Sequence, residues 1–185
     1  MPVSFPPYDR HYLEPLRVTV SSEPTEKEWD ALSCLPDLAD DVPPMDRLRA
    51  LARRKSMAVL VASAAFTRTG EPHTDCGIDW RVVGALIAPL FVGRHPDVHD
   101  IDRRRFNGQT VCEIQELVAD QREVNPTFVM AALLCTLQKC RHELEFDVIR
   151  AVVDLRDHDF LTLLKDAGFE VSRKTLREIS MIRVG

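Results

Sequence analysis

The sequence predicts a single α/β domain built on a mixed sheet with helices on its faces. Apolar segments of strand length alternate along the chain with segments of helical periodicity. A run of antiparallel strands comes first and a strand–helix–strand unit follows, which indicates a mixed, mostly antiparallel sheet. The 185 residues suit one domain, and a hydrophobic fraction of 45% is enough for one substantial core.

The N-terminal half predicts an arm, three strands and two helices. Residues 1–15 are rich in proline and aromatic residues, typical of an arm without regular structure, so the domain itself covers residues 16–185. The expected strands are Leu16–Val20, Met57–Phe66 and Trp80–Val92, the last two forming a hairpin. The expected helices are Ser21–Ser33, with Ser22 as its cap, and Met45–Lys55.

The C-terminal half is organised around one strand and the helix that follows it. Thr110–Ala119 is rich in β-branched residues and predicts a central strand, and Phe128–Leu144 predicts a helix with Asn125 as its cap and Pro126 at its first position. The remaining elements are the strands Asp147–Asp154, Phe169–Val171 and Glu178–Val184, and the helix Asp157–Ala167, which Gly168 ends.

The beginning of the Phe128 helix is apolar on every side, which is typical of a buried helix. A buried helix start offers backbone N–H groups and the positive end of the helix dipole, and both suit an anion such as a phosphate. The sequence therefore predicts a ligand site where the Thr110–Ala119 strand ends.

Composition excludes several classes of protein. The net charge is −5 and no long basic run occurs, which argues against nucleic-acid binding. We find neither a signal-peptide pattern nor an apolar run of membrane-spanning length. The odd number of cysteines favours reduced thiols over a disulfide framework, so we expect a soluble cytoplasmic protein. These cysteines are Cys34, Cys76, Cys112, Cys135 and Cys140.

The element order and two local patterns resemble the GNAT acyltransferase superfamily. Glu113-Ile-Gln-Glu-Leu-Val118 is similar to the family's fourth strand, and Leu163-Leu-Lys-Asp-Ala-Gly-Phe169 to the end of a later helix. The resemblance covers residues 16–184 by element order and residues 110–169 by pattern. It implies a sheet whose fourth and fifth strands splay, and transfer of an acyl group from a thioester to a primary amine of a small molecule or a protein.

The chain departs from the family pattern at the donor site. Where the family has Gln/Arg-x-x-Gly-x-Gly/Ala, this chain has Glu123, followed by Asn125 and Pro126 in place of glycine and its neighbour. Leu164 stands where many members have a tyrosine that protonates the leaving thiolate.

Autoinducer synthases and N-acyl amino acid synthases also lack the glycine loop and use acyl carrier protein, so the resemblance implies acyl-CoA or an acyl-carrier-protein thioester as co-substrate. That branch's N-terminal Arg/Phe/Trp signature is not found. A catalytically silent module that binds a protein partner is the alternative.

Glu113 and Glu116 are the candidate catalytic residues. Strand interiors disfavour glutamate, so two glutamates within four residues of one predicted strand indicate a specific role or partner. Either could be the general base that deprotonates the acceptor amine. Alternatively, each could pair with an arginine of a neighbouring strand, such as Arg81 or Arg150, or face water at a strand end.

The remaining candidates concern the donor and a metal. The resemblance implies that backbone N–H groups of Leu117, Val118 and Ala119 polarise the thioester carbonyl. The side chains of Arg122, Asn125 and Thr127 could contact phosphate, or could simply form a solvated turn and a helix cap. The stretch His95–Asp102 contains histidine and aspartate, but Pro96 and the turn composition argue against a regular metal site, and no metal is predicted. Arg103–Arg105 could dock a carrier protein or RNA, or be a solvated loop.

Overall fold

A computed structural model describes residues 17–35, 38, 42–67, 78–92, 106, 108–122 and 124–184, and the structural statements below concern these residues. Several predictions lie outside them, namely those for the arm (residues 1–15), His95–Asp102, Arg103–Arg105 and Glu123.

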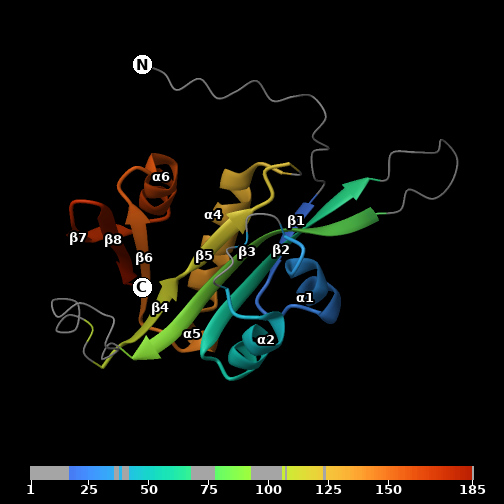
Figure 1. The fold of residues 1–185 in the computed structure, drawn as a ribbon, viewed down its shortest axis with the longest axis horizontal. Helices are drawn as coiled ribbons and strands as arrows, with labels where there is room; N and C mark the ends of the chain where they lie inside the picture. The colour runs from blue at the N-terminus through green and yellow to red at the C-terminus, as the bar shows by residue number, and fades with distance from the viewer. Residues whose placement is uncertain are drawn as a thin grey trace, which may run out of the picture.

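The described residues form one eight-stranded sheet (Figure 1). Its strands are β1 (Arg17–Ser21), β2 (Met57–Thr67), β3 (Ile78–Val92), β4 (Thr110–Ile114), β5 (Glu116–Ala119), β6 (Val148–Asp154), β7 (Glu170–Lys174) and β8 (Glu178–Val184). They are arranged in the order β1-β2-β3-β4-β6-β8-β7, and β5 pairs with β3 beyond the end of β4. Every pairing is antiparallel except that of β4 with β6, so the predicted mixed, mostly antiparallel sheet is confirmed.

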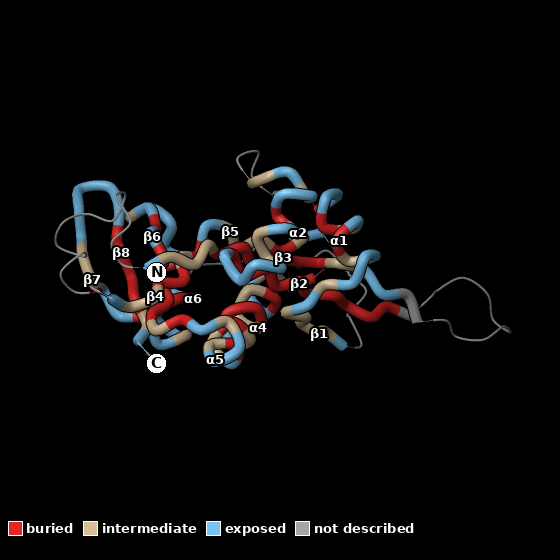
Figure 2. Tube along the Cα trace, turned by 90° about the horizontal axis from the view of Figure 1, so that it is seen from below, coloured by how far each residue is buried: buried red, intermediate tan, exposed pale blue. Residues whose placement is uncertain are grey.

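Helices cover both faces of the sheet. They are α1 (Glu26–Leu32), α2 (Met45–Arg53), α4 (Pro126–Lys139), α5 (Arg141–Leu144) and α6 (His158–Asp166). One apolar cluster joins α1 and α2 to β2 and β3, and we call this side the α1/α2 face. A larger cluster joins α4 and α6 to the opposite side, the α4/α6 face. Figure 2 shows α1 and α2 on one side of the buried strands, with α4 and α5 on the other.

The predicted helices are present, and their ends differ most clearly at the start of α1 and the end of α4. Ser22 does not cap α1. Thr25 does so through a capping box, because its hydroxyl accepts from the Glu28 N–H at 3.3 Å while its own N–H donates to the Glu28 carboxylate at 2.8 Å. Asn125 caps α4 as predicted and Pro126 is its first residue, but the helix ends at Lys139 and a separate turn, α5, follows.

Gly84 allows α4 to lie close to the sheet. It faces Ala119 across the β3–β5 pairing, directly under the first turns of α4. A Cβ at this position would lie 2.6 Å from a Val129 methyl group and 2.8 Å from the Val118 carbonyl oxygen. Only glycine therefore permits this spacing between the helix and the strand.

We expect Gly84→Ala to lower the free energy of unfolding by about 1–3 kcal/mol, the usual cost of overpacking a tight site. Neither neighbour yields easily, since one is a strand carbonyl and the other a buried β-branched side chain. Urea denaturation monitored by circular dichroism measures the loss. An unchanged midpoint would show that α4 can move away from β3 without cost.

Candidate functional site

A β-bulge divides the predicted Thr110–Ala119 strand into β4 and β5. Cys112 pairs with Leu90, whereas Glu116 pairs with Ile87, so residues 113, 114 and 115 lie opposite only residues 88 and 89. The Gln115 N–H also donates to the Ile87 carbonyl at 3.0 Å, which keeps both parts on the same partner strand. The prediction of one uninterrupted strand is wrong in this respect, and the extra residue bends the chain at Gln115.

Beyond the bulge, β5 diverges from β6. The parallel pairing of β4 with β6 runs from Val111–Val148 to Ile114–Ala151 and stops there. β6 continues to Asp154 along β8, while β5 stays on β3, where the Asp120 N–H donates to the Val83 carbonyl at 2.8 Å. The predicted splaying of these two strands is therefore confirmed, and it opens toward the start of α4 (Figure 1).

The divergence leaves backbone N–H groups of β5 facing the side from which β6 has departed. In an antiparallel ladder, successive N–H groups point alternately toward the partner strand and away from it. Because the Asp120 N–H points to β3, that of Val118 does so too, and those of Leu117 and Ala119 point away. Three backbone N–H groups were predicted to polarise a carbonyl. Two of them, those of Leu117 and Ala119, therefore point toward the gap between β5 and β6.

The same bulge places Glu113 and Glu116 on one face of the sheet. Strand residues three apart normally point to opposite faces, and an inserted residue reverses this. Glu116 lies opposite Ile87, which belongs to the cluster of the α1/α2 face. Glu113 follows Cys112 and precedes Ile114, both in the cluster of the opposite face, so it also lies on the α1/α2 side.

Glu113 forms an ion pair with Arg150 of β6. The Arg150 Nη1 donates to the Glu113 carboxylate at 2.6 Å, and its Nε donates to the Ser180 hydroxyl of β8 at 3.3 Å. The side chain of Arg150 is 9% exposed and that of Glu113 is 31% exposed. The pairing that the sequence offered as the alternative for Glu113 is therefore present. Ser180, which orients Arg150, was missed, although a serine among the apolar residues of β8 is a detectable signal.

The start of α4 offers few N–H groups to an anion. Pro126 has none, and the Phe128 N–H donates to the Asn125 side chain at 3.4 Å. The Val129 N–H donates to the Asn125 carbonyl at 3.3 Å. Among residues 127–129, the Thr127 N–H is therefore the one that makes no bond to the cap residue. The side chains of Arg122 and Thr127 are exposed. The Arg122 N–H donates to the Asp120 carboxylate at 2.9 Å, which closes a turn.

Two side chains near the divergence are buried and chemically inert. Leu164 of α6 is 0% exposed within the core, so this position holds no proton donor. Cys112 is also fully buried, and burial raises the pKa of its thiol, which keeps it protonated. Cys112 is therefore a small core residue, not a nucleophile.

Within the described part of the chain, no group of three or more histidine, cysteine, aspartate or glutamate residues could hold a metal ion. Over the same residues, no helix has the length and apolarity needed to cross a bilayer. The described cysteines Cys34, Cys112, Cys135 and Cys140 are free thiols.

A split central strand followed by a helix that starts at the split defines the fold of GNAT N-acetyltransferases, and comparison with solved structures confirms this fold. A chain of the NatC complex bound to Gag peptide and CoA superimposes with a TM-score of 0.60 at 12% identity, over 92% of this chain and 99% of the other. NAA60 of Arabidopsis thaliana in complex with acetyl-CoA gives 0.61 at 9% identity, over 91% and 98%. A GNAT-family acetyltransferase of Streptococcus pneumoniae gives 0.58 at 10% identity, over 91% and 99%.

No family model matches the sequence, and no curated protein matches it. The chain thus has the GNAT fold with a sequence far from those of the similar structures. These likenesses give no support to the autoinducer-synthase branch.

We expect Glu113→Gln to lower the free energy of unfolding by about 1–3 kcal/mol at pH 7, because it leaves the buried Arg150 guanidinium without its anionic partner. The double variant Glu113→Gln/Arg150→Met removes both charges and should recover most of the loss. Urea denaturation of the wild type and both variants tests this coupling. Equal stability of the wild type and Glu113→Gln would show that the ion pair does not hold β4 to β6.

Proposed function

We propose that this protein is an N-acyltransferase that moves an acyl group from a thioester donor to a primary amine. One observation carries the proposal: the bulge at Gln115 directs two backbone N–H groups into the divergence between β5 and β6 and sets a carboxylate beside them on the α1/α2 face. Acyl transfer needs donors for a developing oxyanion and an acceptor for the proton of the amine. Both lie within the four residues of β5.

In this proposal the donor lies along β5 in the place that β6 vacates. The thioester carbonyl oxygen accepts from the N–H groups of Leu117 and Ala119, which stabilise the oxyanion of the tetrahedral intermediate. The Val118 N–H points to β3, so in this proposal Val118 contributes through its side chain, which packs on the α1/α2 face. Acetyl-CoA or CoA is bound in several structures of this fold, including NAA60 of Arabidopsis thaliana and PaiA of Thermoplasma acidophilum. An acyl-CoA is therefore the preferred donor, with an acyl carrier protein as the other possibility.

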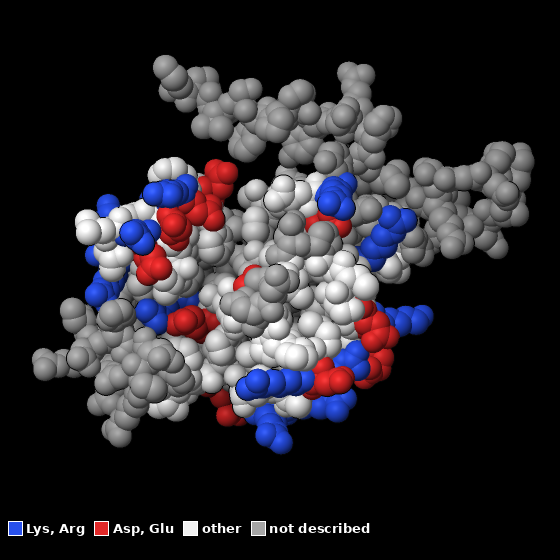
Figure 3. Space-filling view, in the orientation of Figure 1, with Lys and Arg blue, Asp and Glu red and all other residues white. Residues whose placement is uncertain are grey.

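Glu116 is the proposed general base, and Glu113 the residue that fixes Arg150. One oxygen of Glu113 already accepts from Arg150 at 2.6 Å, so this carboxylate is held in place on β4. Glu116 is the first residue after the bulge and adjoins Leu117, whose N–H faces the carbonyl. The acceptor approaches from the α1/α2 face, where Figure 3 shows a mostly uncharged central surface between charged groups at α1–α2 and at α6–β8.

The reaction requires no further protein acid. Glu116 accepts a proton from the amine, directly or through one water, as the amine nitrogen bonds to the carbonyl carbon. The intermediate collapses, the C–S bond breaks, and the thiolate leaves with the bonding electron pair. A thiol has a pKa of about 8.5, so the thiolate is a good leaving group near neutral pH. The thiolate takes a proton from water while Glu116 releases its proton to solvent, which restores the carboxylate. Leu164 in the core of α6 is compatible with this sequence of steps.

A catalytically silent module that binds a protein partner is the second candidate. The capped start of α4 favours it, because Pro126 and the Asn125 cap remove two of the donors that would hold a pyrophosphate. An amine-acetylation screen followed by mass spectrometry separates the two candidates. A silent module gives no acyl transfer at any concentration of donor.

We expect Glu116→Gln to lower kcat by about 10²–10⁴-fold at neutral pH, the usual contribution of a general base. The loss should shrink as the pH rises, because more of the amine is then unprotonated without help. A pH profile of turnover for Glu116→Gln measures this, with Glu170→Gln on the exposed strand β7 as the matched control. Full activity of Glu116→Gln at pH 7 would remove this carboxylate from the mechanism.

We expect free CoA to bind with a Kd about tenfold or more weaker than in a protein whose helix start carries the glycine loop, since each lost charge-assisted contact costs about 1.5–3 kcal/mol. Pro126→Ala restores an N–H at the first helical position and should tighten CoA binding several-fold. Isothermal calorimetry measures both values. Tight binding of CoA to the wild type, or no response to Pro126→Ala, would mean that the phosphates do not depend on this helix start.

A further inference from the structure

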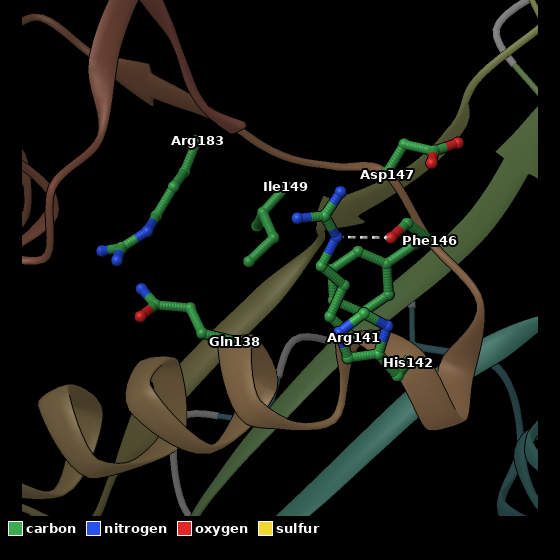
Figure 4. Close-up of a pocket in the computed structure, with 7 residues that line it drawn as sticks. All are labelled: Gln138, Arg141, His142, Phe146, Asp147, Ile149 and Arg183. Carbon is green, nitrogen blue, oxygen red and sulfur yellow. Dashed lines mark hydrogen bonds between the residues drawn. The ribbon is translucent and has the colours of Figure 1, made fainter. Parts of the chain in front are cut away.

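Two arginines at the far end of α4 line a small cavity that the proposed reaction does not use. The cavity has a volume of about 240 Å³ and lies between the end of α4, α5, the start of β6 and the end of β8. We call it the α5 pocket. Figure 4 shows the side chains of Arg183 and Gln138 extended toward each other across it, with Ile149 between Arg183 and Arg141. The 14 residues of α4 place it about 20 Å from the start of that helix.

Arg141 is held in a fixed orientation. Its Nε donates to the Phe146 carbonyl at 3.1 Å, within the turn that connects α5 to β6. A guanidinium anchored through Nε keeps both terminal nitrogens, with four N–H groups, available for another acceptor. Since the anchor is a backbone carbonyl, the orientation is set by the fold and not by another charge.

Arg183 packs against a glycine. Its guanidinium lies over Gly168, where an added Cβ would meet Nη1 at 2.7 Å and the central carbon at 3.3 Å. Gly168 has φ of +81° and ends α6, so the turn requires glycine for its backbone and also leaves room for this arginine. The Gln138 amide donates to the Ala167 carbonyl at 3.3 Å. The second N–H of this amide has no acceptor among the described residues and lies at the same cavity.

Asp147 offsets one of the two arginine charges of the α5 pocket, so the described lining residues keep a net positive charge. Asp147 is the carboxylate that lines it, and its Oδ2 accepts from the Thr110 N–H at 2.8 Å. No ion pair of Arg141 or Arg183 occurs in the part of the chain that the structure describes. A larger cavity of about 580 Å³ near α1 and α2 differs in this respect, because its Arg49 pairs with Glu26 at 2.7 Å and with Asp30 at 2.9 Å.

We propose that the α5 pocket binds the phosphate group of a small molecule. Two guanidinium groups and an amide from three different elements line one cavity, and arginine suits phosphate because its planar fork donates two parallel hydrogen bonds. The floor is apolar, since Phe146 and Ile149 are each 3% exposed, and exclusion of water there strengthens charge–charge attraction. The volume accommodates a phosphate with a few attached atoms. Free phosphate and a small phosphate ester share this chemistry.

Isothermal calorimetry of the full chain tests the site with inorganic phosphate and with glycerol 3-phosphate, at constant ionic strength set by chloride. We expect one saturable site with a Kd on the order of 1 mM or below. Tighter binding of the ester supports an organic ligand, and equal binding supports free phosphate. No saturation up to about 10 mM of either anion, or equally tight binding of acetate, overturns the proposal.

Variants assign the binding to this pocket. Arg183→Gln should weaken phosphate binding about tenfold or more, because it removes one guanidinium and its charge. Arg183→Lys keeps the charge, loses the planar fork and should weaken binding about threefold, which supplies a second test if the glutamine variant does not fold. Arg156→Gln removes an exposed arginine outside the pocket and should leave the Kd unchanged. Unchanged binding in both Arg183 variants overturns the assignment.

Phosphate binding in the α5 pocket can be tested separately from acyl transfer. Pro126→Ala alters the start of α4 and should not change the affinity for inorganic phosphate, because the α5 pocket lies at the other end of that helix. Tighter binding of phosphate in Pro126→Ala would place the phosphate at the helix start and overturn the assignment to the α5 pocket.

Discussion

The pairing of one long strand, β3, with two successive partners is the constraint on which the site depends. β4 and β5 both hydrogen-bond to β3, and the single extra residue between them is absorbed at Gln115. Because β3 holds β5 in the sheet, β6 must separate from it, and the separation exposes backbone donors without breaking the core. The same insertion brings Glu113 and Glu116 to one face. The proposed oxyanion donors and the proposed general base thus arise from a single local irregularity.

The packing of α4 explains why its start is poor at binding anions. Val129, Leu133 and Leu134 are fully or almost fully buried against the sheet, and Gly84 removes the atom that would keep the helix away. A helix held this closely benefits from a rigid beginning, which Asn125 and Pro126 provide. Both residues stabilise the helix by using or removing the N–H groups that a pyrophosphate would need. Stability of α4 and affinity for phosphate therefore oppose each other at these positions.

Sequence patterns predicted the elements better than their irregularities. The apolar run of β2 and the Asn125–Pro126 start of α4 are local signals, and the structure has both elements. The bulge at Gln115 is not local, since its register depends on β3, and a strand pattern looks the same with or without it. The cap at Thr25 was visible as Thr25-x-x-Glu28 but was assigned to Ser22. The α5 pocket joins residues from α4, α5, β6 and β8, which only the tertiary fold brings together.

Weak donors at the start of α4 do not by themselves imply an inactive protein. Contacts with a pyrophosphate are made equally in the ground state and in the transition state, so their loss raises KM and leaves kcat unchanged. In the proposed reaction, the groups whose interaction grows from the ground state to the transition state are the N–H groups of Leu117 and Ala119 and the carboxylate of Glu116, all of which belong to β5. An enzyme with this site would turn over normally only at high donor concentration. A high KM with an ordinary kcat therefore distinguishes a weakened donor site from a silent module, in which no concentration of donor restores turnover.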